Sequence, residues 1–273
     1  MNPRRPPGGT DELLAVSVVT PTRNEAHNVE EFVARACGAL ADEPYSWEIV
    51  FADDSDDQTP KLIAKLSEEG LPVRYVHREI GDRKGSISGA IHAAIPAISS
   101  DVVVVIDCDM QHPPEILPSM IRPILSGEVE LTLGTRYAAG GSAEGLETAW
   151  RRWASRSAGL TIAAFFPQFR RCSDLATGLF AFRLDDFNTG QCPPTGFKVL
   201  VEVLVRCDPR RIGEIPYVFE PRFNGLSKAR VRDGFRLVIA LARARVSLLR
   251  PSAVPVVHPG VVGMSASDAL ANQ

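Results

Sequence analysis

The chain has 273 residues, of which 45% are hydrophobic and 23% charged, a composition typical of a globular protein. Its formal net charge of −3 argues against general nucleic-acid binding, so no nucleic-acid partner is predicted. The five cysteines include no CxxC pair, which favours a reducing cytosol over a disulfide-stapled fold. Residues 1–14 lack the apolar stretch of a signal peptide, and no apolar run approaches the roughly 18–20 residues that cross a bilayer. The sequence therefore predicts a cytoplasmic protein that does not span a membrane.

Strand-like and helix-like patterns alternate over the first 106 residues. Strands are predicted at 16–20, 48–52, 73–77 and 102–106, and helices at 25–40, 60–69 and 86–98. This alternation with short loops indicates an α/β fold whose central sheet is mostly parallel and flanked by helices.

The pattern changes beyond about residue 115. Further strands are predicted at 131–134, 179–183 and 212–219, and helices at 149–166 and 197–206. The predicted organisation is a disordered N-terminus (1–14), one domain (15–229), a basic amphipathic helix (230–250) and a disordered tail (251–273).

The strand at 102–106 is the most informative segment because it runs directly into two carboxylates. Five apolar residues, VVVVI, are followed by Asp107, Cys108 and Asp109. Such a strand is buried on both faces, and ligands of parallel sheets bind beyond the carboxyl ends of the strands. Two carboxylates this close repel each other unless a cation lies between them or one is protonated. A hard divalent ion that also bridges substrate phosphates resolves the repulsion.

Two earlier strands also end in polar residues. The first is followed by RNE at 23–25, and the second runs into DDSDD at 53–57. Turns or helix caps would also explain such residues, and this alternative stays open for Asn24, Asp56 and Asp57. Because parallel strands end at one sheet edge, three such ends favour one shared site over three independent turns.

Several motifs together resemble the family 2 glycosyltransferases, and within them the dolichol-phosphate (polyprenol-phosphate) mannosyltransferase branch. They are PTRNE at 21–25, EIVFADDSDDQT at 48–59, DVVVVIDCDMQHPPE at 101–115 and GTRY at 134–137. The later segments SDLATGLF (173–180), GFKVL (196–200) and PRFNGLSK (221–228) continue the match, which covers about residues 15–235. The resemblance implies a GT-A fold, in which a nucleotide-sugar-binding sheet is continuous with an acceptor-binding half.

The resemblance also implies roles for individual residues. Those expected to line the base and ribose of a nucleotide-sugar are Pro21, Arg23, Glu25, Ala52 and Asp54. The expected ligands of Mg²⁺ or Mn²⁺ are Asp107, Asp109 and Gln111, with Cys108 also at the donor. Those expected to hold the donor diphosphate or the acceptor phosphate are Arg136, Arg222 and Lys228. The family usually has Tyr in place of Arg23, which weakens inference about the base, and a small Ala in place of Cys108.

The expected catalytic set is Asp109, Arg136, Asp174 and Arg222. A cation and arginine forks stabilise the charge that develops on a diphosphate leaving group without any proton transfer. An acceptor that is itself a phosphate needs orientation rather than a strong base. Asp174 either orients the sugar, acts as a weak base, or is a plain turn residue. Lys84 is either a phosphate contact or a solvated loop charge, and His112 is interpreted as structural.

Two stretches suit a membrane surface. The first is 150–166, which begins WRRW and continues with an apolar face; the second is 228–250, with seven basic residues and one acid. Basic amphipathic helices of this kind bind membrane surfaces or acidic partners. The alternative for the second stretch, a core-packing helix with a solvated basic face, stays open.

The predicted function is metal-dependent, inverting transfer of a hexose from a nucleotide-sugar to a polyprenyl phosphate at the cytoplasmic face of a membrane. GDP-mannose is the expected donor by resemblance, and a separate membrane protein is a possible anchor. The alternatives are a UDP-hexose donor, a soluble or polysaccharide acceptor, and a non-catalytic relative that only binds nucleotide-sugar.

Overall fold

The computed structural model describes residues 16–98, 100–146, 148–187 and 199–221, together with Val238, Ile239, Leu241, Ala242 and Arg245. The predicted terminal segments 1–14 and 251–273, and most of the predicted basic helix at 230–250, lie outside the described residues.

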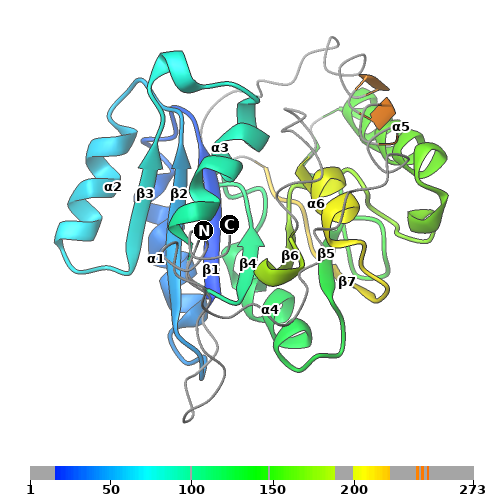
Figure 1. The fold of residues 1–273 in the computed structure, drawn as a ribbon, viewed down its shortest axis with the longest axis horizontal. Helices are drawn as coiled ribbons and strands as arrows, with labels where there is room; N and C mark the ends of the chain where they lie inside the picture. The colour runs from blue at the N-terminus through cyan, green and yellow to red at the C-terminus, as the bar shows by residue number, and fades with distance from the viewer. Residues whose placement is uncertain are drawn as a thin grey trace, which may run out of the picture.

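The described residues form one seven-stranded sheet in the order β3-β2-β1-β4-β6-β5-β7 (Figure 1). The strands are β1 (Val16–Thr22), β2 (Trp47–Asp53), β3 (Val73–His77), β4 (Val102–Val105), β5 (Leu131–Thr135), β6 (Phe180–Arg183) and β7 (Ile212–Pro216). Only β6 runs antiparallel to its neighbours, β4 and β5, and every other pair in this sheet is parallel. The predicted mostly parallel sheet is therefore confirmed.

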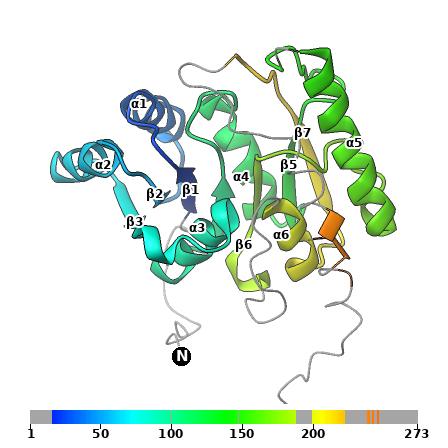
Figure 2. The ribbon, with the colours of Figure 1, turned by 90° about the horizontal axis from the view of Figure 1, so that it is seen from above.

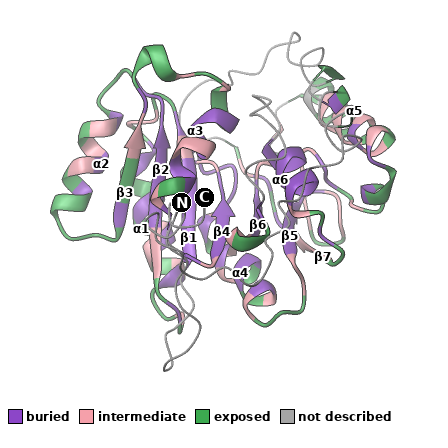
Figure 3. Ribbon diagram, in the orientation of Figure 1, coloured by how far each residue is buried: buried purple, intermediate pink, exposed green. Residues whose placement is uncertain are grey.

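Strand β4 lies in the middle of the sheet, which explains its uninterrupted apolar sequence. On one side Val102 pairs with Val16 of β1, and on the other Val105 pairs with Phe180 of β6. All four residues of β4 are buried, as Figure 3 shows for the centre of the molecule. A strand covered on both faces has no solvent-facing position to carry a polar side chain.

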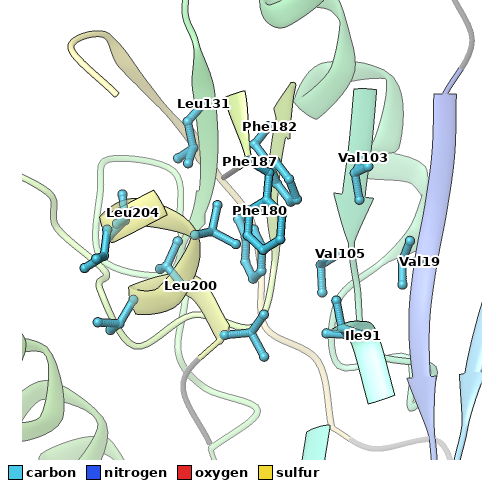
Figure 4. Packing of buried hydrophobic residues seen from close by; sticks show 14 of the residues in the cluster. Val19, Ile91, Val103, Val105, Leu131, Phe180, Phe182, Phe187, Leu200 and Leu204 are labelled. Carbon is cyan, nitrogen blue, oxygen red and sulfur yellow. The ribbon is translucent and has the colours of Figure 1, made fainter. Parts of the chain in front are cut away.

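Helices cover both faces of the sheet (Figure 2). One core cluster joins the sheet to α1 (Val29–Leu40), α2 (Thr59–Glu68) and α4 (Leu117–Leu125). The other joins it to α3 (Ser86–Ala94), α5 (Ala149–Phe165) and α6 (Val199–Cys207). In the second cluster the phenylalanines of β6 lie between Leu200 and Leu204 of α6 and the valines of β4 (Figure 4).

Short 3₁₀ turns lie at several connections. They are η1 (Ile80–Asp82), η2 (Ile95–Ala97), η3 (Pro114–Ile116), η4 (Pro167–Phe169) and η5 (Leu184–Asp186).

The structure corrects the predicted helices in two places. Helix α1 begins at Val29 rather than at residue 25, because Asn24 adopts a left-handed φ of 56° and the chain turns there before the helix starts. Helix α4 was not predicted, and its sequence LPSMIRPIL carries Pro123 inside the helix, a residue that normally argues against helical structure. Its buried face, which includes Leu117, Met120 and Ile121, outweighs that penalty.

Candidate active site

The predicted site residues gather at one edge of the sheet. Strands β2, β1 and β4 are adjacent and parallel, so their carboxyl ends lie side by side, and β5 and β7 point the same way. Because β6 is antiparallel, the segment 174–178 that precedes it enters at this same edge. Arg222 and Lys228 lie outside the described residues.

The predicted base and ribose contacts lie at the ends of β1 and β2. Pro21 and Ala52 are direct partners in the strand register, and Ala52 is fully buried. Arg23 is exposed. The backbone N–H of Glu25 donates to Thr59 Oγ1 at 3.0 Å, and its carboxylate accepts from Asn28 Nδ2 at 2.7 Å. Ala52 therefore shapes the site through packing, while Glu25 is positioned by the start of α2.

Asp53, the last residue of β2, is a buried hydrogen-bond hub. Its carboxylate accepts from Thr22 Oγ1 at 2.8 Å, and His77 Nδ1 lies 2.6 Å away. Ser55 Oγ donates to it at 2.5 Å. These contacts join the carboxyl ends of β1, β2 and β3, so Asp53 organises the edge.

Asp54 forms a bidentate ion pair with Arg78, a residue that sequence reasoning missed. Arg78 Nε and Nη2 donate to the two carboxylate oxygens at 2.8 and 2.6 Å, and both side chains are buried. Arg78 Nη1 also donates to the Lys84 carbonyl at 2.8 Å. The available signal was an arginine immediately after strand β3. The pair fastens the 80–86 segment to the sheet edge, and Lys84 contributes its carbonyl to this contact.

The packing of this segment explains Gly89 and leads to a first prediction. A Cβ on Gly89 would overlap the Lys84 carbonyl oxygen and lie 2.7 Å from Arg78 Nη1. Gly89→Ala should therefore lower the free energy of unfolding by about 1–3 kcal/mol. Gly38→Ala in α1 is the matched control, since a Cβ there meets no atom within 4 Å and should stabilise by up to about 1 kcal/mol. Urea unfolding of both variants measures the difference, and equal stabilities would contradict the packing argument.

The turn interpretation fits the side chains of Asn24 and Asp57, whereas the Asp56 carboxylate accepts a 2.6 Å hydrogen bond from Arg83 Nη1. Asn24 N donates to Ser55 Oγ at 2.8 Å, and Asn24 Oδ1 accepts from Asp56 N at 2.8 Å. Asp57 Oδ1 accepts from Thr59 N at 3.0 Å, at the start of α2. Asn24 therefore ties the two turns together, and Asp57 holds the second turn at the start of α2.

The end of β4 presents its two aspartates differently. The Asp107 side chain is 41% exposed, whereas Asp109 is only 6% exposed and accepts a 3.1 Å hydrogen bond from Gln111 N. Met110, which lies between Asp109 and Gln111, has a φ of 62°, a strained conformation for a residue other than glycine. A Cβ on Gly178 would lie 2.9 Å from Asp107 Oδ2, so the glycine before β6 leaves room for that carboxylate.

The chemistry of these side chains fits Mg²⁺ or Mn²⁺. No group of three or more His, Cys, Asp and Glu residues with metal-binding geometry occurs within the described part of the chain. Mg²⁺ commonly takes one or two protein carboxylates and completes its shell with water and substrate phosphates. Asp107 and Asp109 supply such carboxylates, with the Gln111 amide nearby; Gln111 Nε2 donates to the Glu220 carbonyl at 3.4 Å.

The Cys108 side chain does not contribute to the candidate metal site. Its side chain is buried in the core cluster shared with α1 and α4, and burial raises the pKa of its thiol well above the ordinary value. A protonated, buried thiol does not ligate a hard cation, so a contribution of Cys108 to donor binding would come from its backbone.

His112 is packed as a structural residue, in line with the sequence interpretation. Its ring lies 5.3 Å, centroid to centroid, from both Tyr217 and Phe219, which follow β7. Its Nδ1 is 3.7 Å from Asp107 Oδ2, so the same ring also lies against the exposed carboxylate.

Arg136, which follows β5, and Asp174, in the segment before β6, form a buried bidentate ion pair. Arg136 Nε and Nη2 donate to the carboxylate at 2.7 and 2.8 Å, and Nη2 also donates to Ser155 Oγ of α5 at 3.0 Å. The guanidinium carbon lies 5.2 Å from the centre of the Phe219 ring. Burial disfavours the charged guanidinium, but its hydrogen bonds and attraction to Asp174 outweigh this and raise the pKa of Arg136. Asp174 is thus engaged in holding Arg136.

A nucleotide-binding α/β sheet with paired carboxylates beyond its central strand is the arrangement of the GT-A fold. Solved structures with this fold include glucosyl-3-phosphoglycerate synthase from Mycobacterium tuberculosis in complex with UDP, with a TM-score of 0.60, 19% identity and coverage of 88% of this chain and 82% of that one. The same enzyme with Mn²⁺, UDP and glucosyl-3-phosphoglycerate matches with a TM-score of 0.57 and 21% identity over the same shares of the two chains. The chain belongs to glycosyl transferase family 2, whose model matches residues 17–190.

Within this family, the chain is similar to proteins named dolichol-phosphate mannosyltransferase. The dolichol-phosphate mannosyltransferase of Pyrococcus furiosus is 34% identical over 223 residues, covering 81% of this chain. The chain spans only 61% of the length of that relative. The Saccharomyces cerevisiae enzyme of the same name is 30% identical over 79% of this chain and 81% of its own length. The resemblance stated from the motifs is therefore confirmed.

Proposed function

We propose that this protein is a metal-dependent, inverting glycosyltransferase that moves a hexose from a nucleotide-sugar to a polyprenyl phosphate at a membrane surface. The observation that carries the proposal is the end of β4, where Asp107 and Asp109 stand at the shared carboxyl edge of the sheet. Mannose from GDP-mannose is the proposed donor group, because the relatives above bear the name dolichol-phosphate mannosyltransferase.

Each group at the edge has a task in the proposed reaction. Asp107, Asp109 and Gln111 would hold the divalent ion. When bound, the ion would neutralise charge on the leaving diphosphate. Arg136 follows β5 at the same edge, where Asp174 and Ser155 hold its planar fork in place and where it would face the diphosphate. A preorganised cation of this kind stabilises developing negative charge without reorganising during the reaction.

The state of Asp174 supports a phosphate acceptor. A carboxylate that is buried and paired at both oxygens with Arg136 is poorly suited to removing a proton from a neutral hydroxyl. A polyprenyl phosphate is already anionic and needs only alignment with the donor carbon. A soluble or polysaccharide acceptor, which would need a base, is therefore the weaker alternative.

A UDP-hexose donor is the second candidate. The structural neighbours above bind UDP, and Arg23 replaces the tyrosine usual at the base-binding position of the mannosyltransferases.

The decisive experiment is a donor panel with a detergent-solubilised polyprenyl phosphate. GDP-mannose, UDP-glucose and UDP-galactose are offered separately, with Mg²⁺ or Mn²⁺ and after chelation with EDTA. We expect transfer from GDP-mannose that stops with EDTA and returns with added metal. Transfer from a UDP-sugar alone would select the second candidate, and undiminished transfer in EDTA would refute the metal assignment. Binding of donors without transfer would identify a non-catalytic relative.

The proposed location is the cytoplasmic face of a membrane, with a separate membrane protein as a possible anchor. Among the described residues, no helix has the length and apolar character needed to cross a bilayer. The proposed domain boundaries, 15–229 for the catalytic domain and 230–250 for a basic helix, remain predictions.

A further inference from the structure

Helix α5 carries its large apolar side chains on two opposite sides. Ile162 and Phe166, at and just beyond its end, are buried in the core cluster that includes α6. Trp150, Trp153 and Leu160 are 61%, 60% and 73% exposed. At about 100° per residue the exposed three share one side, away from the buried pair. We call Trp150, Trp153 and Leu160 the tryptophan face.

The tryptophan face has a defined geometry. The rings of Trp150 and Trp153 are stacked, with centroids 4.9 Å apart and an interplanar angle of 23°. Two exposed indoles one helical turn apart form a flat amphipathic surface. Leu160 continues this side two turns later. Large exposed apolar side chains that lie together on one side of a helix, rather than singly, are typical of an interaction site.

The charged side chains of helix α5 are all of one sign, since its sequence has arginines but no aspartate or glutamate. Between residues 149 and 173 the sequence has five arginines and no aspartate or glutamate. Arg152 and Arg156 are exposed on α5, and Arg156 lies 5.0 Å from the centre of the Tyr137 ring. The complementary partner is therefore anionic at its surface and apolar beneath it. A bilayer that contains acidic phospholipids has both properties, and interfacial tryptophan beside arginine suits it.

The opposite side of α5 reaches the candidate active site. Ser155 Oγ accepts the 3.0 Å hydrogen bond from Arg136, and Ser155 lies between Trp153 and Arg156 in the helix. A helix with its side chains is about 10 Å across, so the tryptophan face lies roughly one helix width from the Arg136 contact. A lipid phosphate at the level of the headgroups would have that short distance to cover.

In Figure 1, α5 lies at the opposite end of the molecule from α2, so residues of α2 and of the neighbouring β3 are remote from the tryptophan face.

We propose that the tryptophan face, flanked by Arg152 and Arg156, docks on the headgroup layer of an anionic phospholipid bilayer. This inference rests on the proposed function, because a polyprenyl-phosphate acceptor is delivered from such a layer. It goes further in assigning the contact to one side of one helix.

Vesicle flotation without donor or acceptor tests the surface independently of catalysis. The probes are vesicles of phosphatidylcholine alone and of phosphatidylcholine mixed with phosphatidylglycerol. Trp150→Ala with Trp153→Ala should lower the partition constant for the mixed vesicles at least tenfold. Arg152→Gln with Arg156→Gln should lower it about fivefold per arginine at low salt, and less at high salt.

Controls come from the far end of the molecule. Lys61→Gln with Lys65→Gln removes two exposed cations from α2, and Tyr75→Ala removes an exposed aromatic ring from β3; both should bind vesicles as the original chain does. Fluorescence adds a direct readout, because the chain has three tryptophans and the double alanine variant retains only Trp47. A blue shift on vesicle addition should occur in the original chain and vanish in that variant.

The results separate failure of the surface from failure of the proposed function. Unchanged vesicle binding by the tryptophan variant would overturn the inference, as would a concentration-dependent dimer that the same variant abolishes. Vesicle binding that depends on the tryptophans, in a protein that transfers no hexose to polyprenyl phosphate in detergent, would uphold the surface and refute the function.

Discussion

Replacing Asp109 with asparagine should reduce hexose transfer about a thousandfold or more while leaving the fold nearly as stable. Asp109 is 6% exposed and lies just beyond the central strand, where the diphosphate is proposed to bind. Loss of a carboxylate ligand removes several kcal/mol of charge stabilisation from the transition state, and each 1.4 kcal/mol is a factor of about ten. Asparagine is nearly isosteric and keeps an oxygen that accepts from Gln111 N.

The measurement is kcat/KM across a titration of Mn²⁺, with the melting temperature as a check of folding. Asp42→Asn, at an exposed aspartate just after α1, is the matched control and should change neither quantity. Full activity in Asp109→Asn at saturating metal would remove Asp109 from the proposed site. A lowered melting temperature with proportionate loss of activity would instead make it a structural residue.

Breaking the Arg136–Asp174 pair should cost both stability and activity. Both side chains are buried, so Asp174→Ala leaves an unpaired guanidinium in the protein interior. Removing one partner of a buried ion pair typically costs about 3–5 kcal/mol of folding free energy. Transfer should fall together with stability, because Arg136 loses the two hydrogen bonds that fix its fork.

A double variant separates the two effects. Arg136→Met combined with Asp174→Leu replaces the pair with apolar side chains, and should recover most of the lost stability without recovering transfer. The control is the exposed pair of Arg35 and Glu115, where Glu115→Gln should cost less than about 1 kcal/mol. Recovery of transfer in the double variant would mean that the charge of Arg136 does not act on the substrate.

The sequence predicted the first half of the fold well because its signals there are local. The strands at 16–20, 48–52 and 73–77 lie within or coincide with β1, β2 and β3. Apolar runs indicate the largely buried strands β1 and β2, and β-branched and aromatic residues indicate the edge strand β3. It failed where tertiary packing overrides local preference. Helix α4 forms despite Pro123 because its apolar side is buried, and α1 starts late because Asn24 is held by Ser55 and Asp56.

The motifs identified individual site residues such as Asp54 and Arg136, but not the side chains that form hydrogen bonds with them. Arg78, which follows β3, and Ser155 of α5 are distant in sequence from Asp54 and Arg136 and are ordinary as isolated residues. Asp174 could be assigned no single role, because a carboxylate in a turn has the same appearance whether it is solvated, capping or paired. Its contact with Arg136 is visible only once β6 lies beside β5.

The amino-acid sequence by itself determined the α/β class, the family and the acidic ends of the strands, because periodicity and motif order are properties of neighbouring residues. The tertiary structure alone decided which charges are committed to one another, Asp54 to Arg78 and Arg136 to Asp174, and which side of α5 remains exposed. Such pairings depend on strand order and on the antiparallel insertion of β6, and strand order is set by packing of the whole chain rather than by any local segment.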